Sequence, residues 1–188
     1  MFRFHVWGDR ACFARPEFRR DRISYDIITP LAARGILESI YWSPAIRWHV
    51  DRIHVLQPII FDWLGSEPCR QCDLIDVAYV IEAHFDLSDR ATQTDHVAQH
   101  ASLVRRRARR QEPYRQPFLG TGAYPAHFRS LEAGDDLPPS SFANESVYLG
   151  WTIHDLDTER PPQLRFFRPV IRRGIVELAN LSATDLPA

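Results

Sequence analysis

The sequence predicts an α+β fold, because strand-like and helix-like segments follow in the order β-α-β-β-α over its first 110 residues. Three segments are rich in alternating, β-branched and aromatic residues, as strands are. Two others carry an apolar stripe with helical spacing. Beyond residue 113, Pro and Gly separate short strand-like runs. One strand from that part would complete a ferredoxin-like, or RRM-like, βαββαβ unit.

The first half of this unit has clear local signals. Residues 2–7 (FRFHVW) alternate and predict a strand, and the polar, basic stretch 8–26 predicts a long loop. Thr29 and Pro30 predict a helix start, as N-cap and first helical residue. The helix is expected to end at Ser43-Pro44. Its predicted buried stripe consists of Leu31, Ile36, Leu37 and Ile40.

The second half begins with two strands. Residues 45–60 predict a long strand or a strand with a bulge, residues 65–72 a turn, and residues 75–87 a third strand. One face of that third strand is predicted to carry Val77, Tyr79, Ile81 and Ala83.

The second helix is predicted in the segment DHVAQHASLVRRRARRQ, residues 95–111. His100 lies at the edge of its apolar stripe, and Arg107 lies almost in line with His100. Arg106 and Arg110 fall on the adjacent exposed flank. The helix therefore places an imidazole between the core and a basic surface. The stripe itself consists of Val97, Ala101, Val104 and Ala108.

We predict two parts in the chain: a ferredoxin-like domain over residues 1–120 and a β-rich extension over 121–188 that packs on it and is not independent. With 188 residues, 45% of them hydrophobic, the chain can form one substantial core. No apolar run is long enough to span a bilayer. The N-terminus lacks a signal core and the three cysteines are too few for a disulfide framework, so we expect a cytoplasmic protein.

The charge distribution favours a nucleic-acid partner although the net charge is −1. Residues 1–60 carry nine Arg against six acids, and residues 91–130 carry seven against two. A folded chain could gather these basic blocks on one face. All 23 basic residues are Arg, which binds phosphate through two N–H groups but does not release a proton near neutral pH.

Several motifs allow both an ordinary and a functional interpretation. Cys69 and Cys72, and the pair His96 and His100, have spacings found in metal sites, but neither pair has evident further ligands. The acidic group His154-Asp155-Leu156-Asp157 could serve a metal-dependent nuclease, although strand ends and turns more often look like this. The run from Arg105 to Arg110 is either a solvated face or a phosphate-binding surface.

Tyr41 and Trp42 close the first predicted helix. They either pack in the core or act on RNA, through base stacking or through a phenol that transfers protons. The residues themselves leave both interpretations open.

Longer motifs carry a family resemblance. The segments VWGDRACFARPEFRRDRISYDIITPLAARGILESIYWSPAIRWHVDRIHVLQPI, YVIEAHF, HASLVRRRARRQ, QPFLGTGAYPAHF and YLGWTIHDLD cover nearly the whole chain. They closely resemble the subtype I-C (Dvulg) CRISPR-associated pre-crRNA endoribonucleases, variant d of the fifth Cas subunit, in the RAMP superfamily.

The resemblance implies a ferredoxin-like domain with a C-terminal β-sheet. It implies cleavage of CRISPR repeat RNA at the base of a stem-loop without a metal or other cofactor, leaving a 2′,3′-cyclic phosphate. It further implies that the protein retains the crRNA 5′ handle and joins the backbone and large subunits of the subtype I-C Cascade complex. For some members it implies binding of duplex DNA.

The resemblance also assigns catalytic positions. The family tyrosine falls on Tyr41 and the histidine of its lysine–histidine pair on His100, whereas the lysine position holds Gln99. A crRNA-handle-binding subunit with weak or no cleavage is therefore the alternative function. Phosphate contacts are expected from Arg15, Arg19, Arg20, Arg22, Arg34, Arg105, Arg106, Arg107, Arg109 and Arg110.

Overall fold

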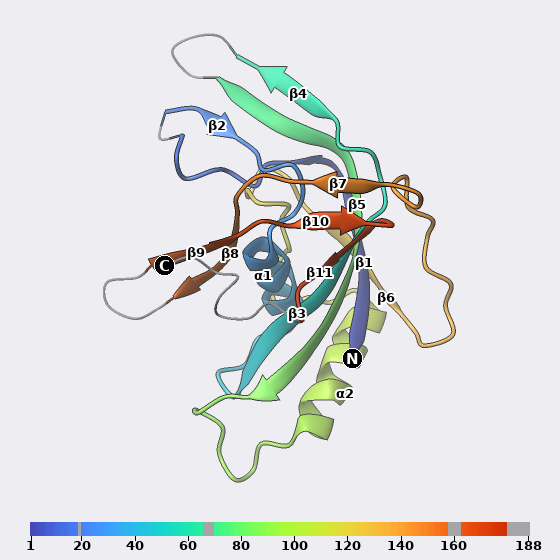
Figure 1. The fold of residues 1–188 in the computed structure, drawn as a ribbon. Helices are drawn as coiled ribbons and strands as arrows, with labels where there is room; N and C mark the ends of the chain where they lie inside the picture. The colour runs from blue at the N-terminus through green and yellow to red at the C-terminus, as the bar shows by residue number, and fades with distance from the viewer. Residues whose placement is uncertain (19, 66–69, 158–162, 180–188) are drawn as a thin grey trace.

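The computed structural model describes residues 1–18, 20–65, 70–157 and 163–179 (Figure 1). Its main sheet contains the predicted ferredoxin-like unit, in which four antiparallel strands have the order β6-β1-β5-β3. The first and last strands of the unit are thus neighbours, as the fold requires. The unit consists of β1 (Phe2–Ala11), α1 (Pro30–Ile40), β3 (Ile46–Val55), β5 (Gln71–Leu87), α2 (Val97–Arg110) and β6 (His127–Leu131).

The sheet continues beyond β3 with strands from the end of the chain. In spatial order these are β11 (Ile175–Glu177), β10 (Val170–Arg172) and β7 (Ser146–Tyr148). β8 (Thr152–Asp157) and β9 (Gln163–Phe167) form a separate hairpin, and β8 lies against α1. β6, which closes the ferredoxin-like unit, follows residue 120. The division into residues 1–120 and 121–188 stays a prediction.

Two short strands occupy segments that the sequence left outside the sheet. β2 (Arg22–Ile23) pairs in parallel with β5, and β4 (Phe61–Leu64) pairs with it antiparallel. β5 is longer than predicted, and its N-terminal end forms the backbone pairing with both β2 and β4. The predicted loop 8–26 is consequently shorter, since β1 extends to Ala11.

The start of α1 is as predicted. The side chain of Thr29 accepts a hydrogen bond from the backbone N–H of Ala32 at 3.1 Å, and Pro30 is the first helical residue. Tyr41 caps the other end, where its backbone N–H donates to the carbonyl of Leu37 at 2.9 Å. The buried face carries Ala33, Ile36, Leu37 and Ile40, whereas Leu31 is only partly buried.

The buried stripe of α2 begins one turn later than predicted. His100, Ala101, Val104 and Ala108 are buried, but Val97 is exposed. Val97 is the first residue of the helix, one turn before the residues that pack on the core. The prediction for Val97 was wrong for this reason, whereas the position of His100 at the edge of the buried stripe is confirmed.

Both helices pack on the same face of the sheet. Phe4 and Val6 of β1 belong to the core cluster that includes the buried residues of both helices, so their neighbours His5 and Trp7 point to the opposite face. β3 has a bulge between Val50 and Arg52, which is one of the two forms that the sequence left open for this strand. In the described part of the chain, neither helix is long and apolar enough to cross a membrane.

Candidate active site

Tyr41, the C-cap of α1, is in contact with His100, which lies near the start of α2. The phenol oxygen of Tyr41 is 2.7 Å from Nδ1 of His100, a hydrogen-bond distance. Tyr41 is 7% exposed and His100 is 5% exposed, although 59 positions separate them in sequence. The two residues that the resemblance assigns to catalysis therefore form one buried pair.

The backbone and neighbouring rings hold this pair in place. The indole N–H of Trp48 donates to the backbone carbonyl of Tyr41 at 3.0 Å, which fixes the end of α1 against β3. The ring of Phe85 on β5 meets the imidazole of His100 edge-on, with centroids 6.4 Å apart. The pair is thereby anchored to two central strands of the sheet.

Asp95 completes the site on the other side of the imidazole. Its Oδ1 lies 3.2 Å from Nε2 of His100. Its Oδ2 accepts hydrogen bonds from the backbone N–H of Thr92 at 2.8 Å and from the hydroxyl of Thr92 at 2.7 Å. The bonds from Thr92 hold the pKa of Asp95 below its usual range, so the carboxylate stays ionised.

These bonds determine which nitrogen of His100 carries the proton when the ring is neutral. An ionised Asp95 can only accept, so Nε2–H donates to it and Nδ1 is left to accept the Tyr41 hydroxyl proton. Burial raises the pKa of Tyr41, and nearby Arg107 partly opposes this. The phenol therefore remains protonated near neutral pH. The result is a tyrosine–histidine–aspartate chain that can pass a proton.

Sequence reasoning did not identify Asp95. The available signal was its place just ahead of the helix, five residues before His100, as the last residue of a Thr-x-x-Asp pattern in which threonine can bond the carboxylate. Gln99 lies beside His100 on α2, but its side chain is exposed. Within the described residues it has no hydrogen bond to Tyr41 or His100.

Comparison with known proteins places this geometry in a family. A family model for CRISPR-associated proteins of the Cas5 group, specifically the Cas5d type, matches residues 1–178. The chain belongs to the Cas5d family.

Curated relatives of the family align along most of the chain. A CRISPR pre-crRNA endoribonuclease Cas5d from Mannheimia succiniciproducens is 37% identical over 98% of this chain and 97% of its own length. A protein of the same name from Thermus thermophilus is 36% identical over 87% of this chain and 78% of its own.

Two solved structures share the fold. A crystal structure of a CRISPR-associated protein superposes with a TM-score of 0.87 at 23% identity, over 100% of this chain and 94% of that one. A functionally uncharacterized protein from Streptococcus mutans gives 0.84 at 24% identity, over 94% and 91%. The ferredoxin-like fold of this Cas5d chain is thus confirmed.

The arginines of α2 in this Cas5d chain differ in their surroundings. Arg106 and Arg110 are exposed, as is Arg109, which pairs with Glu132 at 3.1 Å. Together with Ser102 and Arg105 they line a shallow cavity of about 320 Å³. Arg107 is only partly exposed, and its guanidinium donates to the carbonyl of Glu112 at 3.2 Å.

The other predicted arginines lie elsewhere. Figure 1 shows β2 and β4 at one end of the molecule and the first turn of α2 at the other. Arg20 and Arg22 are exposed near β2, and Arg15 pairs with Asp26 at 2.8 Å. Arg19 lies outside the described residues. Arg34 pairs with Asp155 at 2.8 Å. Phosphate binding by these residues stays a prediction.

The histidine pair of α2 does not form a chelate. His96 is the exposed N-cap of the helix, while both ring nitrogens of His100 already face Tyr41 and Asp95. Among the residues that the structure describes, no group of three or more His, Cys, Asp or Glu side chains is arranged to hold a metal ion.

The two remaining metal motifs are only partly described. Cys69 lies outside the described residues, and burial raises the pKa of the Cys72 thiol. The carboxylate of Asp155 is held by Arg34, and the side chain of Asp157 is not described. Among the described side chains of these motifs, none is hydrogen-bonded to Tyr41 or His100.

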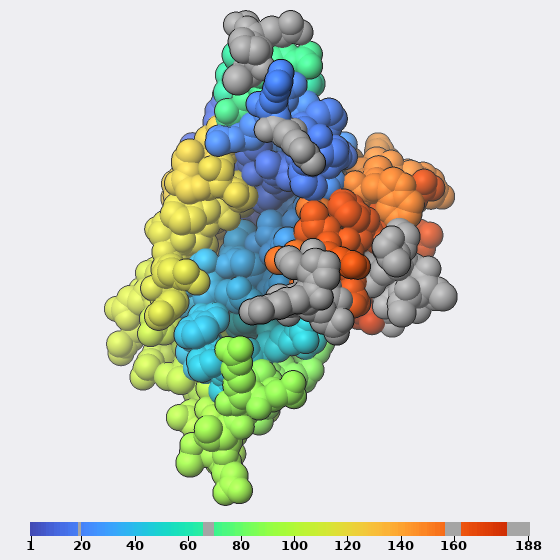
Figure 2. Space-filling model, turned by 90° about the vertical axis from the view of Figure 1, so that its left-hand side faces the viewer, coloured from blue at the N-terminus to red at the C-terminus, as the bar shows by residue number. Residues whose placement is uncertain are grey.

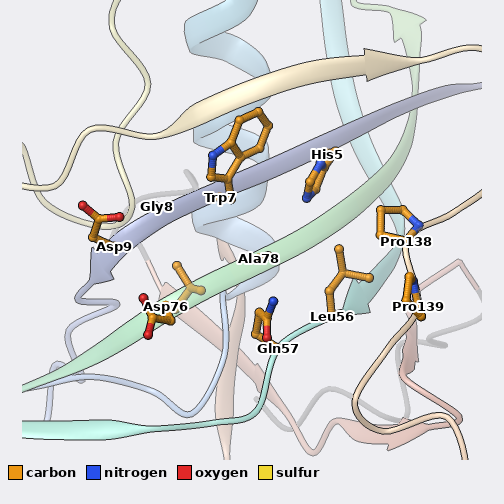
Figure 3. A pocket seen from close by; sticks show the side chains of 11 residues that line it. His5, Trp7, Gly8, Asp9, Leu56, Gln57, Asp76, Ala78, Pro138 and Pro139 are labelled. Carbon is orange, nitrogen blue, oxygen red and sulfur yellow. The ribbon is translucent and has the colours of Figure 1, made fainter.

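A separate cavity of about 560 Å³ opens on the sheet face away from the helices (Figure 3). His5 and Trp7 of β1 and Asp76 of β5 line it. Figure 3 shows these side chains on the side of the sheet opposite the helix behind it. The cavity is therefore not part of the site formed by Tyr41 and His100.

Proposed function

We propose that this chain is a pre-crRNA endoribonuclease that cuts CRISPR repeat RNA and uses Tyr41 and His100 for proton transfer. The main observation that supports this proposal is the buried 2.7 Å contact between the Tyr41 hydroxyl and His100 Nδ1, with Asp95 on the opposite side of the ring. The activity in the names of the two curated relatives supports the same assignment.

The proposed reaction uses the RNA's own 2′-hydroxyl as the nucleophile. The 2′-oxygen bonds to the adjacent phosphorus, the bond from phosphorus to the 5′-oxygen breaks, and a 2′,3′-cyclic phosphate remains. Tyr41 takes the 2′-hydroxyl proton as its own proton passes to Nδ1 of His100, and Asp95 stabilises the resulting imidazolium. The proton then returns along the same chain to the leaving 5′-oxygen.

Charge on the phosphorane also needs a cation. Arg107 is near enough to affect the pKa of Tyr41 and can supply charge, but a guanidinium does not donate a proton near neutral pH. Gln99 supplies neither charge nor a proton. In this proposal, proton transfer depends on the tyrosine–histidine–aspartate chain and electrostatic stabilisation on arginine.

After cleavage the protein would keep the 5′ handle of the crRNA and act as a subunit of a subtype I-C Cascade complex in the cytoplasm. The backbone and large subunits would be its protein partners, and duplex DNA a further ligand. The exposed arginines of α2 support an RNA-binding surface, because guanidinium groups bind phosphate bidentately.

The deciding experiment is cleavage of the chain's own repeat RNA in EDTA. We expect a single cut at the hairpin base and a 2′,3′-cyclic phosphate, both lost in His100→Ala. RNA with a 2′-deoxy nucleotide at the cut should bind and remain intact. Protein that binds the repeat but does not cut it in EDTA would contradict the proposal, and recovery of cutting with Mg²⁺ or Mn²⁺ would instead favour a metal-dependent nuclease at His154, Asp155 and Asp157.

The second candidate function is a crRNA-handle-binding subunit with weak or no cleavage. The observation that favours it is Gln99, exposed beside His100 in a chain without lysine. This function predicts that crRNA in cells matures normally when His100 is replaced by Ala. Loss of maturation in that variant would instead support the nuclease.

A further inference from the structure

A groove of about 800 Å³ lies beside the end of α1. Three segments distant in sequence line it: the stretch from α1 through the turn to the start of β3, the loop after β5, and the hairpin of β8 and β9. In Figure 2 the light blue to cyan surface of the turn lies directly above the green surface of the loop. The side chains used below are Trp42, Arg47 and Arg90.

The groove has unpaired positive charge. Arg47 and Arg90 line it, and within the described part of the chain neither has a carboxylate within salt-bridge distance. Arg34 also lines the groove but is held by Asp155 at 2.8 Å and Glu38 at 3.6 Å. Two guanidinium groups are therefore available to an anionic ligand.

Trp42, which lines the groove, is part of an exposed aromatic stack. The rings of Trp42 and Tyr114 lie 6.2 Å apart at 27°, and the side chains are 45% and 50% exposed. The guanidinium of Arg115 lies 5.6 Å from the Tyr114 ring centre. Exposed, preoriented rings beside cationic groups are the combination that binds single-stranded nucleic acid.

Backbone bonds hold this stack rigidly. The N–H of Tyr114 donates to the carbonyl of Ile40 at 3.1 Å, and the N–H of Arg115 donates to that of Ser39 at 2.9 Å. Both carbonyls belong to the last turn of α1, where helix acceptors otherwise lack partners. The ring of Trp42 is thus stacked on a fixed Tyr114 and also lines the groove.

Two chain segments connect the lining of the groove with the catalytic site. Trp42 directly follows Tyr41, whose hydroxyl bonds His100. The loop after β5 lines the groove with Ser88, Asp89 and Arg90 and then carries Asp95 to the imidazole. A strand bound in the groove would therefore lie within a few nucleotides of the proton-transfer chain.

We propose that this groove is a subsite for single-stranded RNA flanking the cleaved bond, in which one base stacks on Trp42 while Arg47 and Arg90 bind its phosphates. The inference rests on the proposed function for the identity of the RNA. It assigns positioning to Trp42 and the two arginines, and proton transfer to none of them.

The test measures binding apart from cleavage, with repeat RNA made uncleavable by a 2′-deoxy nucleotide at the cut. Trp42→Ala is expected to weaken binding by about 5- to 100-fold, and Trp42→Phe by clearly less, because phenylalanine retains a stacking face. Trp63→Ala removes a tryptophan that is more exposed than Trp42 and lies on strand β4, and this variant is expected to bind normally. Circular dichroism establishes that each variant is folded.

A fluorescent base locates the stack. 2-Aminopurine, placed at one position of the repeat at a time, is expected to be quenched at one or two positions next to the cut, and to lose this quenching in Trp42→Ala but not in Trp63→Ala. Equal quenching and affinity in folded Trp42→Ala and wild type would overturn the subsite. That result would leave the proposed nuclease intact, whereas unmodified repeat RNA that binds through Trp42 and is not cut in EDTA would refute the nuclease alone.

The salt dependence of RNA affinity tests Arg47 and Arg90 separately from Trp42. Arg47→Gln and Arg90→Gln are each expected to lower the slope of log affinity against log salt by about 0.7, the value for one phosphate contact on a single strand. Arg172→Gln, on β10, is the matched control because Arg172 is exposed outside the groove. Unchanged slopes in both groove variants would contradict phosphate binding there.

Discussion

Asp95 lies 3.2 Å from Nε2 of His100, on the opposite side of the imidazole from Tyr41. This contact fixes the neutral ring in the form whose Nδ1 can accept the tyrosine proton. Thr92 holds the carboxylate with two hydrogen bonds. The catalytic potential of the pair therefore depends on a loop that precedes α2.

Replacing Asp95 by Asn tests this relationship. The amide can donate to Nε2, which would favour the tautomer with hydrogen on Nδ1 and prevent it from accepting from Tyr41. We expect the single-turnover rate of cleavage to fall on the order of 10²-fold with RNA affinity nearly unchanged. Asp136→Asn removes an exposed acid in the loop after β6 and serves as the control. An unaltered rate in Asp95→Asn would show that Asp95 does not orient the ring.

Tyr41→Phe removes one hydroxyl and retains the ring. The variant leaves Nδ1 of His100 without its partner in a buried site, so we expect a loss of about 1–2 kcal/mol in the free energy of unfolding, measured with denaturant. Cleavage should fall roughly 10²- to 10⁴-fold through loss of proton transfer. Tyr148→Phe, with an exposed ring, should alter neither. Cleavage at the wild-type rate in folded Tyr41→Phe would exclude the phenol from the chemistry.

Gln99→Lys restores the residue that the family resemblance places at this position. Gln99 is exposed and next to His100, so an ammonium can be added there without burying a charge. We expect a gain in cleavage rate on the order of 10- to 100-fold, from stabilisation of the phosphorane. Gln93→Lys adds the same charge in the preceding loop, where Gln93 is also exposed. Equal gains in the two variants would indicate general attraction of RNA and not a catalytic role.

The basic surface of α2 predicts a salt-dependent loss of binding. Arg106 and Arg110 are exposed and, in the described part of the chain, have no salt-bridge partner, whereas Arg109 is paired with Glu132. Replacing Arg106 and Arg110 by Gln should lower the salt slope of RNA binding by about 1.4 if each contacts one phosphate. Replacing Arg109 should have a smaller effect. Filter binding over a salt series measures both, and a slope insensitive to either change would remove α2 from the RNA surface.

Three partly buried histidines predict pH-dependent stability. Burial holds the pKa values of His5, His49 and His154 below the usual 6.5. The unfolded chain therefore binds more protons as pH falls below about 6.5, so their contribution is present above that pH and lost below it. Replacing each by Gln should flatten the dependence of the unfolding free energy on pH below about pH 6.5. Identical profiles for all three variants and wild type would contradict this.

Much of the fold was predictable because its signals are local. The cap formed by Thr29 and Pro30 and the buried edge position of His100 follow from neighbouring residues and helical spacing. Val97 was predicted wrongly because helical spacing does not say where along the helix packing begins. The short strands β2 and β4 were missed because they depend on pairing with the distant strand β5.

The sequence by itself determined the order of the main elements, the two catalytic candidates and the basic character of α2, since periodicity, residue type and motif similarity are properties of the chain. The tertiary structure decided that Tyr41 and His100 touch and that Asp95 holds the imidazole. It also decided that Arg34 is paired with Asp155, while Arg47 has no salt-bridge partner among the residues that the structure describes. These contacts join residues from different elements, and only the packing of both helices on one sheet face sets their distances.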